Sequence, residues 1–386
     1  MNSALRLGVF YAAVFVGTGA SLPYMPVWFR THGLSGSQIG LLLSAPLLAR
    51  AVTGPLLAIW ADGFVLRRSP VALLLLAAGV AYSAIGFTAG FGAWFVLWFV
   101  AGTLMSTVTP LTDVLTLRRA GREAFNYGWP RGIGSAAYIV ANVGAGALLA
   151  RTSSDVILIW TAAAAIGAAL VAVVLLPPEP VEESGQVIAR RERWRGVGGL
   201  LRDRTFMLAV VSIGLIQATH AFYYGFSALA WRREGIGEGM VGLLWGFGVA
   251  VEIGFLWFLE PWRRRIGPER LLIMGGVAAV VRWTAFAFSP PLWLLFPLQA
   301  LHTFTFAATF VGGLMIVERL APARAATAAQ TISSAFSGGL LIGLATLASG
   351  ALYDLAHAKG YLLMAAMAAL GLVGALRLNR LTSAAL

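Results

Sequence analysis

The sequence contains no cysteine, few charged residues and few histidines. Of its 386 residues, 11% are charged and four are histidine. Without cysteine, the chain can form neither disulfides nor thiolate–metal sites. Soluble domains carry about 25% charged residues, so this deficit argues against a large soluble core. Apolar residues take the place of charge, because 59% of the chain is hydrophobic and the mean hydropathy is +0.81.

The motifs of several function classes are also missing. No Gly-x-x-x-x-Gly-Lys-Ser/Thr phosphate loop occurs, which excludes an ATP-driven pump within this chain. No metal-ligand spacing such as His-Glu-x-x-His occurs, so an integral membrane enzyme is disfavoured, and we expect neither a metal site nor a cofactor. A channel would need rings of pore residues and a sensor an attached signalling domain, and the sequence shows neither. The remaining class is a transporter, which is not an enzyme.

Apolar runs long enough to cross a bilayer recur along the whole chain. A span takes roughly 20 largely apolar residues, and backbone groups in hydrocarbon must be satisfied internally, so such runs are helical. Met1 leads almost directly into the first run, so we expect a spanning helix there and not a signal peptide. The pattern predicts an all-α membrane protein with twelve transmembrane helices, at residues 7–29, 38–60, 70–89, 92–117, 131–150, 155–176, 206–231, 240–260, 269–288, 292–317, 327–353 and 360–376.

The formal net charge of +12 reflects membrane topology. If the N-terminus is cytoplasmic, most of the 28 Lys and Arg residues fall in cytoplasmic connections, as the positive-inside rule requires. We therefore predict that both termini are cytoplasmic. We also predict a multi-pass protein of a cell inner membrane whose partners are the lipid bilayer and a small solute, and not nucleic acid.

The longest polar connection divides the predicted helices into two sets of six. It runs from Pro177 to Arg204 and is rich in proline, glutamate and arginine. Six spans on either side of such a connection are the layout of a duplicated transporter. The sequence therefore predicts an N-terminal bundle at 1–176, a cytoplasmic linker at 177–204 and a C-terminal bundle at 205–386.

Several segments resemble known transporter signatures. The segment 54–68 resembles the cytoplasmic signature of the major facilitator superfamily, although Ala58 and Val65 stand where glycines are usual and Gly63 where a basic residue is usual. The segments 219–226, 244–253, 281–283 and 298–302 resemble the phenylpropionate permease branch, a relative of the lactose permease.

The resemblance implies the major facilitator fold, with two pseudo-symmetric six-helix halves that act as a monomer. It also implies a secondary active transporter that works by alternating access. A proton-coupled importer of an aromatic carboxylate such as 3-phenylpropionate is the favoured function. A sugar or nucleoside symporter, or an uncoupled uniporter or exporter, remains an alternative.

Three ionisable residues lie at membrane depth in the second half. Counting from the ends of their spans places Glu252 about 12 Å, His302 about 15 Å and Arg282 about 20 Å deep. By the resemblance, Arg282 and His302 match the coupling arginine and histidine of the lactose permease, whereas Thr305 replaces its proton-carrying glutamate. We therefore predict that Glu252 carries the proton, with Arg282 as modulator and His302 as relay or substrate contact. The alternative is a static Glu252–Arg282 pair that specifies helix packing.

Other polar residues are candidates for substrate contact. The resemblance assigns substrate binding to Asp113 and Arg131, provided that their helices extend past the membrane; the alternative is a salt bridge between the two helices. Arg50, inside the second span, could bind a carboxylate through a bidentate hydrogen bond, or could be a structural arginine held by carbonyl groups or an ion pair. Further candidates are Gln217, His220 and Tyr224, which share one helical face, and Gln299 in the segment 298–302.

A final charged group follows the second predicted span. Asp62, Arg67 and Arg68 lie in the connection that carries the superfamily-like signature. We predict that they stabilise the state closed to the cytoplasm and do not touch the substrate.

Overall fold

The computed structural model describes residues 2–180, 198–322 and 325–383. Within these ranges the chain is helical and contains no β-strand; the only bridge there joins Leu66 to Pro180. Most of the predicted linker, residues 181–197, lies outside the described residues. The chain forms two compact units: Met1–Glu182 with Gly225–Ala250, and Glu183–Tyr224 with Val251–Leu386.

Eleven segments of the described chain are long and apolar enough to cross a membrane. Ten of them coincide with the first ten predicted spans. The eleventh, Ala328–Ser383, has 56 residues and covers the last two predicted spans, with a 3₁₀ turn inside it at His357–Gly360. The all-helical prediction is therefore confirmed, whereas the count of twelve spans stays a prediction.

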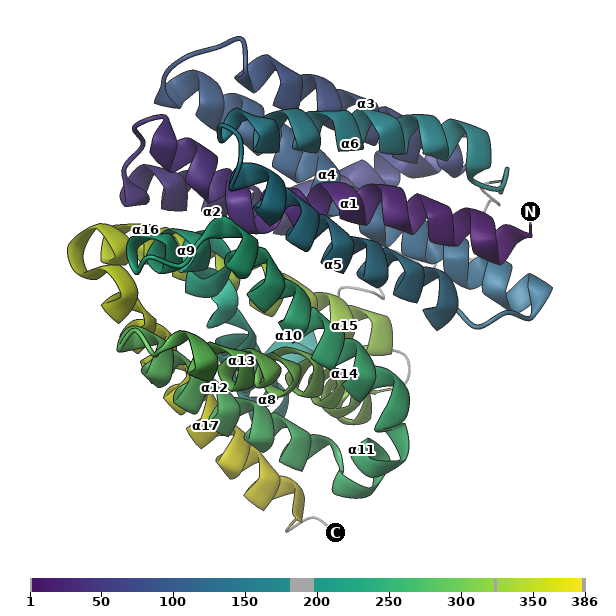
Figure 1. Ribbon diagram of the computed structural model, residues 1–386. Helices are drawn as coiled ribbons and strands as arrows, with labels where there is room; N and C mark the ends of the chain where they lie inside the picture. Colours follow the sequence, from purple (N-terminus) through teal and green to yellow (C-terminus); the bar gives the residue numbers. More distant parts are fainter. Residues whose placement is uncertain (1, 181–197, 323–324, 384–386) are drawn as a thin grey trace. The chain divides into compact units, whose positions relative to one another are not determined.

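The first unit is built around α1. This helix packs against α5 and α6, while α3 packs against both α4 and α6 (Figure 1). Leu7, Phe10, Leu75, Val108 and Ala168 are among the buried residues of its apolar core. The helices are α1 (Ser3–Thr31), α2 (Gly36–Asp62), α3 (Arg68–Ile85), α4 (Phe91–Glu123), α5 (Gly128–Leu149) and α6 (Asp155–Leu175).

Local signals begin and end these helices. Ser35 caps α2, because its hydroxyl accepts from the backbone N–H of Gln38 while the Gln38 side chain accepts from the Ser35 N–H. Between α1 and α2 the chain reverses at Gly33, whose φ of +89° favours glycine.

Two helices divide their residues between the units. These are α9 (His220–Arg233) and α10 (Glu238–Phe258). In the first unit, the Tyr24 hydroxyl donates to the backbone oxygen of Glu238 at 3.0 Å. A Cβ at Gly146 of α5 would meet that same oxygen and the Tyr24 hydroxyl. Small residues therefore allow α5 and α10 to approach closely, as is common between membrane helices.

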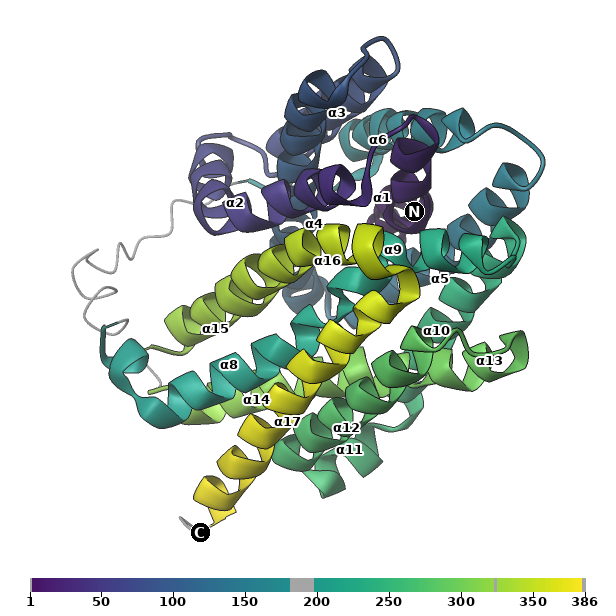
Figure 2. The same cartoon turned by 90° about the vertical axis from the view of Figure 1, so that its left-hand side faces the viewer.

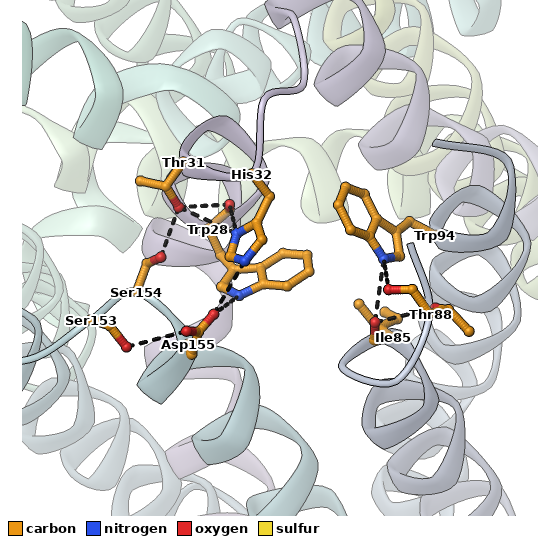
Figure 3. A network of polar contacts seen from close by, with 9 residues as sticks. All are labelled: Trp28, Thr31, His32, Ile85, Thr88, Trp94, Ser153, Ser154 and Asp155. Carbon is orange, nitrogen blue, oxygen red and sulfur yellow. Dashed lines mark hydrogen bonds and ion pairs between the residues drawn. The ribbon is translucent and has the colours of Figure 1, made fainter. Parts of the chain in front are cut away.

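A polar cluster joins the end of α1 to the start of α6 (Figure 3). The carboxylate of Asp155 accepts from Trp28 Nε1 at 2.9 Å and lies 3.3 Å from His32 Nε2. The His32 ring stacks on the Trp28 ring with 4.1 Å between centroids. Thr31 and Ser154 add a hydroxyl–hydroxyl contact of 2.7 Å. Because the end of α1 and the start of α6 both contribute partners, the cluster holds these two helix ends together.

In the second unit, α12 packs against α17 and α14, and α8 packs against α17 (Figure 2). Two π-helical turns, η1 and η3, interrupt the α-helical pattern, and such turns often lie at functional sites. The elements are α8 (Arg204–Ala218), α11 (Glu260–Ile266), α12 (Pro268–Ala287), α13 (Leu292–Ala300), η1 (Thr303–Ala308), α14 (Thr309–Leu320), α15 (Ala326–Ala335), η3 (Phe336–Leu341), α16 (Ile342–Ala356), η4 (His357–Gly360) and α17 (Tyr361–Ser383).

Candidate functional site

A buried row of polar contacts lies in the second unit. Arg282, on α12, is fully buried and donates through Nη1 to His302 Nδ1 at 3.2 Å. On the other side of the ring, His302 Nε2 lies 3.3 Å from Glu252 Oε2. A guanidinium has no acceptor, so Nδ1 must be the acceptor and the imidazole proton lies on Nε2, facing Glu252. The imidazole therefore bridges the cation and the carboxylate.

This arrangement differs from a direct Glu252–Arg282 pair. Both residues belong to the described part of the second unit, and no ion pair joins them there. Glu252 instead contacts His302, and the two side chains are only 16% and 8% exposed. The structure thus brings together the three residues predicted for proton coupling, with His302 in the middle position.

Neutral groups supply the other partners of Arg282. Its Nη1 also donates to Thr305 Oγ1 at 3.2 Å, and its Nη2 donates to Gln299 Oε1. The guanidinium carbon lies 4.8 Å from the centroid of the Tyr223 ring and 4.5 Å from that of Trp283. Aromatic faces attract a cation, but they do not neutralise it. Within this network the compensating charge is therefore that of Glu252, one imidazole away.

The residues predicted to share one helical face extend this network. His220 Nδ1 donates to the backbone oxygen of Gln217 at 3.0 Å, and His220 Nε2 lies 3.0 Å from Thr305 Oγ1. The Gln217 side chain donates to the carbonyl of Phe306, while the Tyr224 ring stacks on His220 at 5.5 Å. Because Thr219 separates α8 from α9, these three residues come from two helices.

Two members of the network were not predicted. The Tyr223 hydroxyl accepts from Gln299 Nε2 at 2.9 Å, and Thr305 contacts both Arg282 and His220. The sequence marked Thr305 only as the residue that replaces a glutamate. No spacing rule connects Tyr223 with a partner 76 positions away.

A second polar cluster surrounds Asp113 in the first unit. Its Oδ1 atom accepts from the Tyr11 hydroxyl at 2.6 Å and from the Tyr127 hydroxyl at 2.9 Å. Arg131 Nη1 lies 3.5 Å from the same oxygen. The helix α4 has 33 residues and is therefore about 50 Å long, more than the roughly 30 Å of a hydrocarbon core. The condition applied to both helices, and α5, with 22 residues, is only about 33 Å long. Substrate binding by Asp113 and Arg131 therefore stays a prediction, and their pair is the contact that the alternative describes.

Arg50 differs from these residues because it has no polar partner in the described part of the chain. It lies half-buried in α2, between Pro46 and Pro55. Among the described residues, none accepts a hydrogen bond from Arg50 or forms an ion pair with it. These residues therefore do not provide the carbonyl or carboxylate partner that a structural arginine would have.

The predicted gating residues lie beside a buried carboxylate. Arg67 Nη1 is 3.8 Å from Asp62 Oδ1, and Arg68 Nη1 donates to the carbonyl of Val173 at 3.3 Å. Glu179, just past α6, is fully buried. Its backbone oxygen accepts from the backbone N–H of Arg67 at 2.9 Å.

The Glu179 side chain also binds the end of α4. Its carboxylate lies 2.6 Å from Arg119 Nε and 2.6 Å from Arg122 Nη1, both near the end of α4. This role was not predicted, because the sequence pattern gives these arginines only a part in topology. Their contribution depends on a carboxylate 57 positions from Arg122, which no local pattern indicates.

The described residues offer no cluster of three or more histidine or acidic side chains that could hold a metal ion.

Comparison with known proteins gives consistent matches over most of the chain. Residues 4–363 match the MFS_1 like family. A probable 3-phenylpropionic acid transporter of Escherichia coli (strain K12) is 30% identical over 360 residues, covering 92% of each chain. A maltose permease of Geobacillus stearothermophilus is 29% identical over 357 residues, covering 90% of this chain and 86% of that protein.

Solved structures show the same fold at lower identity. The nucleoside transporter NupG superposes with a TM-score of 0.81 at 17% identity, covering 98% of this chain and 99% of that one. A bacterial homologue of the human lysosomal transporter Spinster superposes with a TM-score of 0.72 at 15% identity, covering 98% and 96%.

Proposed function

Because the chain belongs to the MFS_1 like family of major facilitator superfamily transporters, we propose that it imports a small organic anion together with a proton. In this proposal twelve helices form two halves, 1–176 and 205–386, joined by a linker at 177–204. The two halves give alternating access, and the protein acts as a monomer. It lies in the inner membrane of a cell, with both termini in the cytoplasm. Asp62, Arg67 and Arg68 stabilise the state closed to the cytoplasm.

The Arg282–His302–Glu252 chain carries this proposal. The Glu252 carboxylate contacts one imidazole and is only 16% exposed, so a change in its protonation alters the charge balance among Arg282, His302 and Glu252. With Glu252 ionised, its charge compensates that of Arg282. With Glu252 protonated, the buried arginine is left with neutral partners only, and a buried uncompensated charge is unfavourable. A negative charge brought by a substrate restores the balance, which couples the proton to an anion.

Arg50 supports the choice of an anion. It is a half-buried cation that the described residues leave without an acceptor, and a guanidinium matches a carboxylate with two parallel hydrogen bonds. The relative in Escherichia coli is named for 3-phenylpropionic acid, an aromatic carboxylic acid. We therefore propose an aromatic monocarboxylate as substrate. Other proposed contacts are Asp113, Arg131, Gln217, His220, Tyr224 and Gln299.

A neutral solute is the second candidate, and the Asp113 cluster favours it. Asp113 Oδ2 has no hydrogen-bond partner among the described residues, and Arg131 has donors beyond the one that faces Asp113. An acceptor beside a donor fits hydroxyl groups, which both donate and accept. A maltose permease and a nucleoside transporter are among the relatives and neighbours.

The test is uptake of labelled 3-phenylpropionate into proteoliposomes, with and without an inward proton gradient. Glu252→Gln is compared with wild type and with Glu238→Gln, a matched control on the same helix. We expect Glu252→Gln to abolish gradient-driven accumulation but to retain counterflow, while Glu238→Gln accumulates substrate. Accumulation by Glu252→Gln would overturn the assignment of the proton. If wild type transports none of this probe but takes up maltose or uridine, the second candidate replaces the first.

A further inference from the structure

All the hydrogen bonds that Asp113 accepts from the described residues end on one of its two carboxylate oxygens. Tyr11, Tyr127 and Arg131 all reach Oδ1, at 2.6, 2.9 and 3.5 Å. Oδ2 has no partner in the described part of the chain, and the side chain is 27% exposed. The carboxylate is thus fixed by one oxygen and open at the other.

The two tyrosines come from different elements, so their two hydrogen bonds together determine how the Asp113 carboxylate is oriented. Tyr11 lies on α1 and is 1% exposed, whereas Tyr127 is the half-buried N-cap residue of α5. Asp113 lies on α4. Two donors that converge from two helices leave the carboxyl plane little freedom to rotate, since any rotation lengthens one of the bonds.

The hydroxyl proton of Tyr11 is committed to Asp113. Tyr11 also lies 3.1 Å from Thr116 Oγ1, but Thr116 uses its own proton for the backbone oxygen of Thr112 at 2.8 Å. The shorter contact of Tyr11, 2.6 Å, is the one to Asp113. A hydroxyl has only one proton to donate, so Tyr11 donates it to Asp113 and does not donate to Thr116.

Tyr11 also positions Arg131. The guanidinium carbon of Arg131 lies 5.4 Å from the centroid of the Tyr11 ring and 5.1 Å from that of Phe15. Cation–π contact at this range holds the guanidinium without using its N–H donors. One tyrosine therefore orients both members of the charged pair, while the described residues leave Oδ2 of Asp113 and the remaining N–H groups of Arg131 without a partner.

We infer that Tyr11 and Tyr127 are positioning residues that fix Asp113 by Oδ1 so that Oδ2 is presented to the transported molecule. This inference rests on the proposed transport function for its functional consequence, but its geometric basis is independent of the substrate. The tyrosines act through Asp113. Their removal should therefore matter only while Asp113 is present.

A double-mutant cycle tests this dependence without any substrate. Thermal unfolding in detergent is measured for Tyr11→Phe/Tyr127→Phe, Asp113→Asn and the triple variant. Tyr82→Phe is the control, because Tyr82 is a buried tyrosine of the same unit whose hydroxyl has no hydrogen bond among the described residues. We expect the tyrosine pair to lower Tm by about 2 to 4 °C when Asp113 is intact, and by less than about half of that when Asp113→Asn is already present. Equal decreases in both backgrounds would overturn the inference.

Transport kinetics separate positioning from a merely structural role. The probes are labelled 3-phenylpropionate, maltose and uridine, and the variants are compared for whichever probe wild type transports. We expect Tyr11→Phe/Tyr127→Phe to raise KM about tenfold with Vmax changed less than about twofold, and to have no further effect when Asp113→Asn is present. An unchanged KM alongside a lowered Tm would overturn the inference.

The two proposals can fail separately. If wild type transports none of the three probes, the proposed substrates fail, and the thermal cycle alone decides the inference: coupled decreases support it and additive decreases overturn it.

Discussion

Replacing a pH gradient by a membrane potential tests the proposed charge balance directly. In the described part of the second unit, Glu252 is the carboxylate that contacts the buried Arg282–His302 pair. One such carboxylate can take up one proton per cycle. A monocarboxylate brings one negative charge, so proton and substrate together carry no net charge. The expected transport is driven by the pH gradient and is indifferent to the membrane potential.

The expected magnitudes follow from this one-to-one charge balance. A gradient of one pH unit stores about 1.4 kcal/mol per proton, which supports about tenfold accumulation. A potential of about 100 mV is worth roughly 2.3 kcal/mol for each net charge moved, or about 50-fold accumulation. For a neutral cycle the same potential contributes nothing. An anionic and a neutral substrate therefore differ by more than one order of magnitude in the accumulation that the same membrane potential drives.

The assay uses proteoliposomes with potassium and valinomycin to set the potential and buffers to set the pH gradient. Labelled 3-phenylpropionate is expected to accumulate about tenfold per pH unit at any potential. Glu252→Gln should respond to neither driving force. A response of about 50-fold to a potential of about 100 mV would refute the one-to-one charge balance, because a net charge would then cross with the substrate.

Three further predictions concern single residues. Glu179→Gln removes the buried carboxylate that Arg119 and Arg122 of α4 share, and should lower stability by about 2 to 4 kcal/mol, measured as a loss of Tm in detergent. Gly146→Ala should destabilise the protein, because its Cβ would meet the Glu238 carbonyl, whereas Gly144→Ala, whose Cβ makes only ordinary contact at 3.6 Å, should not. Arg50→Gln should raise KM for a carboxylate at least about tenfold, and Arg50→Lys should restore only part of the affinity; an unchanged KM would remove Arg50 from the site.

The positions of the spans were predictable because hydrophobic runs carry that information locally. The limits of α1 to α6 follow the predicted runs to within several residues, with larger differences where polar residues continue a helix beyond its apolar run. The extension of α4 to Glu123 is an example: Arg118, Arg119 and Arg122 are good helix formers, but they are not apolar. Hydropathy locates the part of a helix that lies in lipid, and helix propensity decides where it ends.

The members of the candidate site could be named from the sequence, but their contacts could not. Depth counting and family resemblance selected Glu252, Arg282 and His302, which the fold brings together. The order of these contacts, with the imidazole in the middle, depends on how α10, α12 and the segment between α13 and η1 pack, and sequence spacing does not contain that information. The tyrosines around Asp113 were missed for the same reason, since Tyr11 lies 102 positions from its partner.

The π-helical turn η1 has a practical consequence for anyone who scans this region with single cysteines, for which the cysteine-free chain is well suited. Where the turn ends, the Thr309 hydroxyl bonds back to the carbonyl five residues earlier, at Phe304. A π turn adds one residue to the helix, so every position after it is rotated by about 100° from its place on a regular helical wheel. His302 and Thr309, seven positions apart, would share a face on such a wheel but are out of phase here. Labelling patterns on α13 and α14 should therefore be fitted to two separate wheels, with the change of phase at residues 303–308.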